Sequence, residues 1–327
     1  MRFTVVGAGA WGTALATHLV RAGHPVRVWA LEPEVVQGVR ESHRNHLYLP
    51  EVELPEGFWA TTRLQEAAAD AEVVLVVVPS EFCRGLYREL RPLLPARTAL
   101  VSATKGLEVG SLLRMTEVAA QEIPDRPLAV LSGPSFALEV AREHPTAVVV
   151  ASREAEVAGA LQRAFSRRTF RVYSSSDVTG VELAGALKNV IAIAAGIIDG
   201  LGYGHNTVAA LITRGLAEMT RLAAALGGRP ETLAGLAGLG DLVLTCTGAL
   251  SRNRRLGQAL GRGQTLEQAT ASRTVAEGVR TTRAACDLAG RVGVELPISS
   301  QMRSVLYEGK PPREAVDELM SRSLKRE

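Results

Sequence analysis

The sequence is poor in aromatic residues and in cysteine. Phe, Trp and Tyr make up only 4% of its 327 residues, so we expect cores of closely packed Ala, Leu and Val side chains. The three cysteines, Cys83, Cys246 and Cys286, are too few and too scattered for a disulfide framework or a zinc cluster. This pattern excludes a disulfide-rich secreted domain, and we expect a cytoplasmic protein without a metal site.

The sequence also has no large surplus of charge of one sign and no long apolar run without charged residues. The chain carries 37 basic and 34 acidic residues, mixed along its length, so we expect no nucleic-acid partner. The start, MRFTVVGAGAWG, lacks the basic segment, apolar run and cleavage site of a signal peptide. The most apolar window, residues 181–198, contains Glu182, Lys188 and Asn189, which are costly at a bilayer centre, so we expect no membrane span.

Lysine is scarce, because only four of the 37 basic residues are lysines. These are Lys105, Lys188, Lys310 and Lys325. Lys188 lies in the apolar stretch GALKNVIAIAAG (residues 185–196), where a lysine can exchange a proton and an arginine cannot. Partial burial and a neighbouring cation lower the pKa of a lysine toward the range used in acid–base catalysis. The alternative is a side chain whose amine reaches water from an apolar helix.

Short β-rich runs recur in the first half of the chain, separated by segments with helical periodicity. The runs lie at residues 3–6, 26–30, 73–78, 98–103, 127–131, 146–150 and 170–173. Continuous apolar strands that alternate with helices predict a doubly wound parallel sheet covered on both faces. After Tyr173 only helical periodicity remains, with breaks at residues 200–205, 227–230 and 309–312. We therefore predict an α/β domain over residues 1–176 and an all-α domain over residues 177–327.

A glycine motif follows the first predicted strand. VVGAGAWGTALATHLVRAG (residues 5–23) places Gly7, Gly9 and Gly12 in the G-x-G-x-x-G spacing before a helix. The first glycine permits a tight turn, the second lets the backbone approach a pyrophosphate, and the third allows close helix packing. Glu32, 20 residues after Gly12, is suited to accept from an adenosine ribose hydroxyl, which favours NAD over NADP; the alternative is a solvated charge. The first domain is thus predicted to be Rossmann-like and to bind a dinucleotide.

Three further motifs place reactive groups beside glycines. SATKGLE (102–108) sets Lys105 just beyond the end of a predicted strand, where open α/β sheets bind ligands. LSGPSFALEVA (131–141) does the same with Gly133, Ser135 and the backbone N–H groups at a helix start. GLAGLGDLVLTCTG (235–248) holds Asp241 in an otherwise uncharged run, for which a helix N-cap is the alternative.

A basic cluster lies in SRNRRLG (251–257). Ser251, Arg252 and Asn253 offer a hydroxyl, a guanidinium and an amide that together suit a phosphate monoester, although such clusters are often solvated faces. His43 and His46 have helical spacing but no nearby carboxylate or thiol, so we predict a surface helix and no metal pair. Cys246 has no histidine positioned to activate it and is predicted to be a small packing residue.

These motifs resemble, in order and approximate spacing, those of the bacterial-type NAD(P)-dependent glycerol-3-phosphate dehydrogenases. The likeness also includes ELAGALKNVIAIAAGI and VAEGV (275–279) and runs from Val5 to at least Arg280. It implies a Rossmann-like N-terminal domain, a helical C-terminal domain and a substrate cleft between them. It also implies reduction of dihydroxyacetone phosphate, a triose phosphate, to sn-glycerol 3-phosphate in glycerophospholipid synthesis, and a homodimer.

The resemblance also implies roles for individual residues. Lys188 is expected to be the proton donor and acceptor, with Lys105 and Asp241 organising the carbonyl end of the substrate. The residues expected to line the substrate are Lys105, Gly133, Ser135, Lys188, Asp241, Ser251, Arg252 and Asn253. Those expected to contact NAD or NADP are Gly7, Gly9, Ala10, Trp11, Gly12, Lys105, Ala137, Arg252, Val275 and Glu277.

The sequence departs from the family pattern at two positions. Ala10 stands where relatives often have serine, and Leu31 where many have an arginine suited to a 2′-phosphate. These departures, with Glu32 adjacent, favour NAD slightly. One alternative is a β-hydroxyacid or phosphogluconate-type dehydrogenase, against which the SRNRR cluster and the position of Lys105 argue. Another is a catalytically silent dinucleotide sensor.

Overall fold

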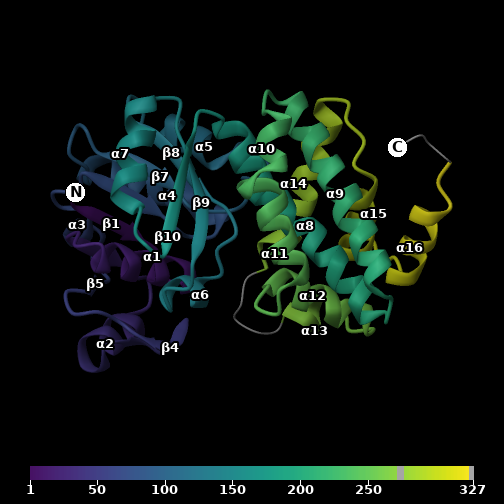
Figure 1. Cartoon of the computed structure of the whole chain (residues 1–327), viewed down its shortest axis with the longest axis horizontal. Helices are drawn as coiled ribbons and strands as arrows, with labels where there is room; N and C mark the ends of the chain where they lie inside the picture. The colour runs from purple at the N-terminus through teal and green to yellow at the C-terminus, as the bar shows by residue number, and fades with distance from the viewer. Residues whose placement is uncertain (271–275, 324–327) are drawn as a thin grey trace. The chain divides into compact units, whose positions relative to one another are not determined.

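The computed structural model describes residues 1–270 and 276–323, in two compact units (Figure 1). The sheet unit comprises Met1–Lys105 and Leu113–Glu182, and the helical unit comprises Gly106–Leu112 and Leu183–Glu327. The division falls inside helix α8 (Val178–Gly200), and one loop of the first half of the chain belongs to the helical unit. The predicted boundary after residue 176 remains a prediction.

The sheet unit is built on an eight-stranded sheet of order β10-β9-β8-β7-β6-β1-β2-β5. Its strands are β1 (Phe3–Val6), β2 (Val26–Trp29), β5 (Trp59–Thr61), β6 (Val73–Val76), β7 (Ala99–Ser102), β8 (Leu128–Ser132), β9 (Thr146–Ala151) and β10 (Phe170–Ser175). The seven predicted runs all form strands. The order β5-β2-β1-β6-β7-β8 is that of the Rossmann fold, with the strand order reversing between β1 and β6.

Both faces of the sheet are buried, because the strands are apolar at successive positions. In β6, Val73 and Leu75 join one core while Val74 and Val76 join the other. One core is covered by α1 (Ala10–Arg21), α2 (Pro33–Ser42), α6 (Ala137–Ala141) and α7 (Ala155–Phe165). The other is covered by α3 (Leu64–Ala68), α4 (Ser80–Leu90) and α5 (Met115–Glu122), and a short 3-10 helix, η1 (Arg91–Leu93), follows α4. The doubly covered sheet is therefore confirmed.

Three details differ from the prediction. Strand β9 pairs antiparallel with β8, so the sheet is mixed at that edge. The short edge strand β5 and the hairpin of β3 (Arg44–Asn45) and β4 (Leu49–Glu53) have no long apolar run to reveal them. The surface helix expected at His43 and His46 is wrong, because His43 has a left-handed backbone (φ 50°) that ends α2, and the chain turns into the hairpin.

The second half of the chain is helical, as predicted, and no strand follows Ser175 in its described residues. The helices are α9 (His205–Ala225), α10 (Pro230–Ala234), η2 (Leu236–Gly240), α11 (Asp241–Thr247), α12 (Arg252–Gly261), α13 (Leu266–Thr270), α14 (Glu277–Arg291), α15 (Pro297–Tyr307) and α16 (Pro312–Met320). Helix α8 begins where the Asp177 carboxylate accepts from the Gly180 N–H (2.8 Å). It is the one described helix long and apolar enough to cross a membrane, yet its apolar window is wholly buried, as in a core helix.

Candidate active site

The glycine turn joins β1 to α1 beside the point where the strand order reverses. Gly7 has a left-handed backbone (φ 112°), which disfavours any other residue. A Cβ on Gly12 would lie 1.8 Å from the Gly7 carbonyl oxygen, so only glycine lets helix and turn approach this closely. A Cβ on Gly9, by contrast, would meet nothing within 4 Å. The turn therefore leaves open space at the N-terminus of α1, where backbone N–H groups favour an anion.

Two predicted cofactor residues open helix α1. Ala10 is its first residue, and Trp11 follows with its indole ring packed against the core of the sheet unit. The Trp11 Nε1 atom is buried and has no hydrogen-bond partner within the described residues. A buried N–H donor is costly without an acceptor, so this side of the turn fits a polar ligand such as a dinucleotide.

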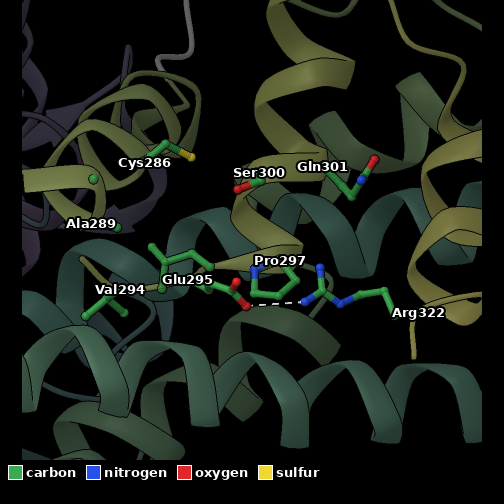
Figure 2. Close-up of a pocket in the computed structure, with 10 residues that line it drawn as sticks. Cys286, Ala289, Val294, Glu295, Pro297, Ser300, Gln301 and Arg322 are labelled. Carbon is green, nitrogen blue, oxygen red and sulfur yellow. Dashed lines mark hydrogen bonds and ion pairs between the residues drawn. The ribbon is translucent and has the colours of Figure 1, made fainter. Parts of the chain in front are cut away.

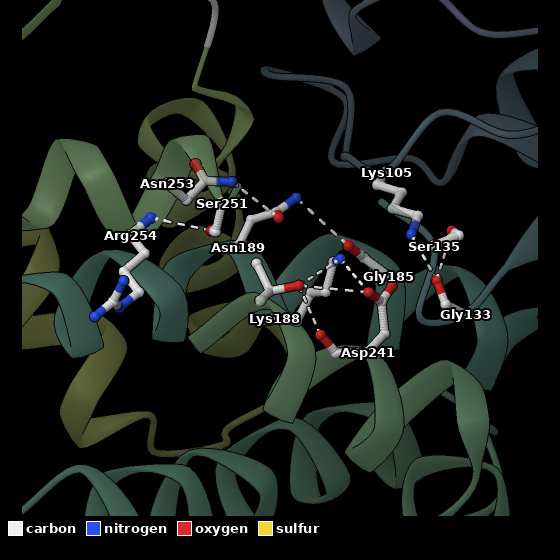
Figure 3. Close-up of polar contacts among 11 residues, drawn as sticks. Lys105, Gly133, Ser135, Gly185, Lys188, Asn189, Asp241, Ser251, Asn253 and Arg254 are labelled. Carbon is white, nitrogen blue, oxygen red and sulfur yellow. Dashed lines mark hydrogen bonds and ion pairs between the residues drawn. The ribbon is translucent and has the colours of Figure 1, made fainter. Parts of the chain in front are cut away.

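The carboxyl ends of β7 and β8 bring together three predicted residues. The Lys105 amine donates to the Gly133 carbonyl oxygen (3.0 Å), and the Ser135 hydroxyl donates to the same oxygen (2.9 Å) (Figure 3). Gly133 has φ +135°, and a Cβ there would lie 2.9 Å from the Val148 Cα. The strand ends thus hold an amine and a hydroxyl where open α/β sheets bind ligands.

Lys188 lies in the middle of α8 and is buried, with 5% exposure. Its Nζ atom is 2.5 Å from the Asp241 carboxylate and 2.8 Å from the Thr245 hydroxyl (Figure 3). Asp241 is 1% exposed and begins α11. The amine is therefore buried between protein side chains and does not extend into water, as the alternative interpretation required. A neighbouring carboxylate favours a positive charge on an amine and opposes the effect of desolvation.

Thr245 was not foreseen from the sequence. It lies one helical turn after Asp241 on α11, so both side chains lie on the same face, and its hydroxyl donates back to the Asp241 carbonyl oxygen (2.6 Å). The sequence signal that could have indicated Thr245 is its i, i+4 spacing from Asp241, a predicted site residue. Together the carboxylate and the hydroxyl fix the direction of the Lys188 amine.

Asn189 and Asn253 join α8 to α12. The Asn253 amide donates to the Asn189 side-chain oxygen (3.0 Å), and its own oxygen accepts from the Gly278 N–H (3.0 Å). The Ser251 hydroxyl accepts from the Arg254 N–H (3.2 Å) and caps α12. Ser251 and Asn253, two predicted substrate residues, therefore also hold the starts of α12 and α14 in place.

The arginines of the SRNRR cluster separate into different roles. Arg254 pairs with Asp199 of α8 (2.8 Å). Arg252, at the exposed first position of α12, makes no hydrogen bond or ion pair within the described residues. A cation at a helix N-terminus suits an anionic ligand.

Two further predicted cofactor residues lie at helix starts. Ala137 begins α6, and Glu277 begins α14. Val275 lies outside the described residues.

The other candidate groups among the described residues do not indicate a nucleophile or a metal site. Burial raises the pKa of the Cys246 thiol to about 12, which suits a packing residue rather than a nucleophile. Among the described residues, no three His, Cys, Asp or Glu side chains gather as metal ligands would. A pocket of about 380 Å³ in the helical unit, lined by residues such as Cys286, Glu295 and Arg322, contains none of the predicted site residues (Figure 2).

Comparisons with known proteins identify the same family that the order of the motifs resembles. A family model described as the NAD-dependent glycerol-3-phosphate dehydrogenase N-terminus matches residues 2–158, and its C-terminal counterpart matches residues 177–317. A protein of Geobacter sulfurreducens named glycerol-3-phosphate dehydrogenase (NAD(P)+) is 54% identical over 330 residues, covering 100% of this chain and 98% of its own. One of the same name from Koribacter versatilis is 54% identical, covering 98% and 97%.

Solved structures lead to the same family. The glycerol-3-phosphate dehydrogenase of Coxiella burnetii is 43% identical, with a TM-score of 0.95, and covers 98% of this chain and 99% of its own. The Saccharomyces cerevisiae enzyme is 27% identical, with a TM-score of 0.83, and covers 97% and 98%. These matches favour this family over the hydroxyacid-type and silent-sensor alternatives.

Proposed function

The chain belongs to the NAD-dependent glycerol-3-phosphate dehydrogenase family and is an NAD(P)-dependent oxidoreductase, and we propose that Lys188 donates and accepts the proton of its reaction. The proposed reaction interconverts dihydroxyacetone phosphate and sn-glycerol 3-phosphate, as the family resemblance implies. The nicotinamide cofactor supplies the hydride when it is bound. The chain itself must then hold the triose, neutralise its phosphate and deliver a proton to the carbonyl oxygen.

The observation that carries this proposal is the buried contact of Lys188 with Asp241 and Thr245. The carboxylate and the hydroxyl both accept from the amine and so limit its direction. An ammonium held in this way gives its proton to an oxygen that gains negative charge, and takes it back in the reverse reaction. Arginine would keep the charge at this position without a usable proton.

The substrate is proposed to lie among Lys105, Gly133, Ser135, Lys188, Asp241, Ser251, Arg252 and Asn253. The cofactor is proposed to contact Gly7, Gly9, Ala10, Trp11, Gly12, Lys105, Ala137, Arg252, Val275 and Glu277. Support comes from the open space at Gly9, the buried Trp11 donor and the guanidinium at the start of α12. A cytoplasmic homodimer serving phospholipid synthesis completes the proposal, on the family resemblance alone.

The test is the substitution Lys188→Arg in the full chain. We expect kcat with dihydroxyacetone phosphate to fall by about 10² or more, because the general acid is lost. The dissociation constant of NADH, measured by nucleotide fluorescence, should stay within about twofold of wild type, because the charge is kept. The matched control is Lys310→Arg, since Lys310 pairs with Glu318 in the same unit and should tolerate the change.

A near-normal kcat in the Lys188→Arg variant would refute the role of Lys188. Turnover of hydroxyacids in place of the triose phosphate would refute the proposed substrate.

A further inference from the structure

The β3–β4 hairpin supports the glycine turn from the side. Asn45, at the end of β3, is completely buried. Its side-chain amide donates to the Ala8 carbonyl oxygen (2.8 Å) and to the Thr13 hydroxyl oxygen (2.8 Å). Ala8 lies between the first two glycines of the motif, so a residue 37 positions away holds the backbone of the turn.

The same hairpin holds the acid that follows β2. The Tyr48 N–H donates to the Asn45 side-chain oxygen (3.1 Å), and the Tyr48 hydroxyl donates to the Glu32 carboxylate (2.6 Å). Glu32 is the N-cap residue of α2, and its side chain makes no cap hydrogen bond. A continuous chain of hydrogen bonds therefore runs from Ala8 through Asn45 and Tyr48 to Glu32.

The charge of the side chain that follows the second strand of a Rossmann fold determines whether NAD or NADP is preferred. A carboxylate there accepts from the 2′-hydroxyl of the adenosine ribose, whereas a cation accommodates a 2′-phosphate. Leu31, beside Glu32, is 70% exposed and offers no cation. A carboxylate that is free to move would swing away from a 2′-phosphate and lose much of its discrimination, whereas a carboxylate that is held in place keeps it.

We infer that Tyr48 is a specificity-determining residue that holds the Glu32 carboxylate for the ribose hydroxyls of NAD(H) and against the 2′-phosphate of NADP(H). This inference rests on the cofactor site proposed at the glycine turn. Tyr48 acts through Glu32, and the hydrogen bonds of Asn45 fix both parts of the site in one arrangement.

The test measures the dissociation constants of NADH and NADPH by nucleotide fluorescence, without turnover. The wild type should bind NADH more tightly. Tyr48→Phe removes one hydrogen bond to a charged group, so we expect NADH to bind about fivefold more weakly while NADPH changes by less than about twofold. Tyr173→Phe is the control, because it removes a tyrosine hydroxyl from the exposed side of β10 in the same unit.

A double-mutant cycle shows whether Tyr48 acts through Glu32. Glu32→Gln should itself shift the preference toward NADPH, and adding Tyr48→Phe to it should then change the NADPH/NADH ratio by less than about twofold. An unchanged ratio in Tyr48→Phe, or the full effect persisting beside Glu32→Gln, overturns the inference. An unchanged NADPH/NADH ratio in Glu32→Gln also overturns the inference, whether or not Tyr48→Phe folds.

A reference variant tests the underlying site separately. Gly9→Val places a side chain in the open space of the glycine turn and should weaken NADH and NADPH equally. If it weakens neither, the proposed cofactor site is wrong, whatever Tyr48 does. The proton role of Lys188 is read from kcat and is independent of these binding measurements.

Discussion

The sheet unit and the helical unit build their candidate sites from different materials. The glycine turn is a site of backbone groups and open space, where side chains are absent at Gly7, Gly9 and Gly12. The site around Lys188 is a set of buried polar side chains that satisfy one another. The first is therefore sensitive to added volume, and the second to any change of functional group.

Burial is the reason why we expect the side-chain site to tolerate few substitutions. Removing one partner of a buried ion pair leaves the other charge uncompensated in a medium that solvates it poorly. A backbone site has no such partner to lose, since its N–H groups do not change with sequence. The comparison predicts that substitutions in the helical unit act mainly on chemistry and those in the glycine turn mainly on binding.

The largest effect that sharpens this comparison is expected from Asp241→Asn. The amide keeps the shape of the side chain but cannot balance the Lys188 charge, so we expect kcat to fall by about 10² with cofactor affinity unchanged. Steady-state rates and NADH fluorescence titrations measure the two quantities. Asp287→Asn is the control, because Asp287 pairs with Arg303 on the surface of the same unit. A kcat within about twofold of wild type would show that the buried pair does not serve catalysis.

The same difference decides how much of each site the sequence reveals. The glycine turn is local: a strand, three glycines and a helix within residues 5–23 are enough to predict its place and its ligand class. Lys188 was suspected because lysine is rare in this chain. Its partner Asp241 lies 53 positions away, and no local pattern states that the two side chains meet.

Other features depend on tertiary packing that local patterns do not encode. The hydrogen bond from Asn45 to Ala8 joins residues 37 positions apart, and the antiparallel pairing of β9 with β8 depends on the direction in which the chain re-enters the sheet. The hairpin strands are too short for a periodicity of two to be visible. The prediction was therefore strongest for the sheet, the helical second half and the turn, and weakest for contacts between side chains.

A smaller effect is expected from Gly12→Ala in the sheet unit. The added Cβ would lie 1.8 Å from the Gly7 carbonyl oxygen, so the turn and α1 must separate. Overpacking of this kind costs about 2 kcal/mol, which corresponds to roughly 30-fold weaker binding of both NADH and NADPH if the strain falls on the site. Nucleotide titrations measure the loss, and kcat at saturating cofactor should change far less.

Gly85→Ala is the matched control for this substitution. Gly85 lies on α4 of the same unit, and a Cβ there would meet nothing within 4 Å. If Gly12→Ala lowered kcat while leaving nucleotide affinity intact, the turn would not be the backbone-built binding site that the comparison supposes.

The smallest of these effects is expected from Arg252→Ala. It would be a binding defect in the helical unit, so it tests the rule that substitutions in this unit act mainly on chemistry. Arg252 stands at the exposed start of α12 without an ion pair in the described residues, so we expect its loss to raise KM for dihydroxyacetone phosphate about tenfold with little change in kcat. Arg254→Ala removes a guanidinium already paired with Asp199, so it should lower thermal stability and leave KM unchanged. If Arg254→Ala raised KM and Arg252→Ala did not, the phosphate would be bound elsewhere in the cluster. If kcat fell in Arg252→Ala as it does in Asp241→Asn, the guanidinium would belong with the buried side chains that serve chemistry.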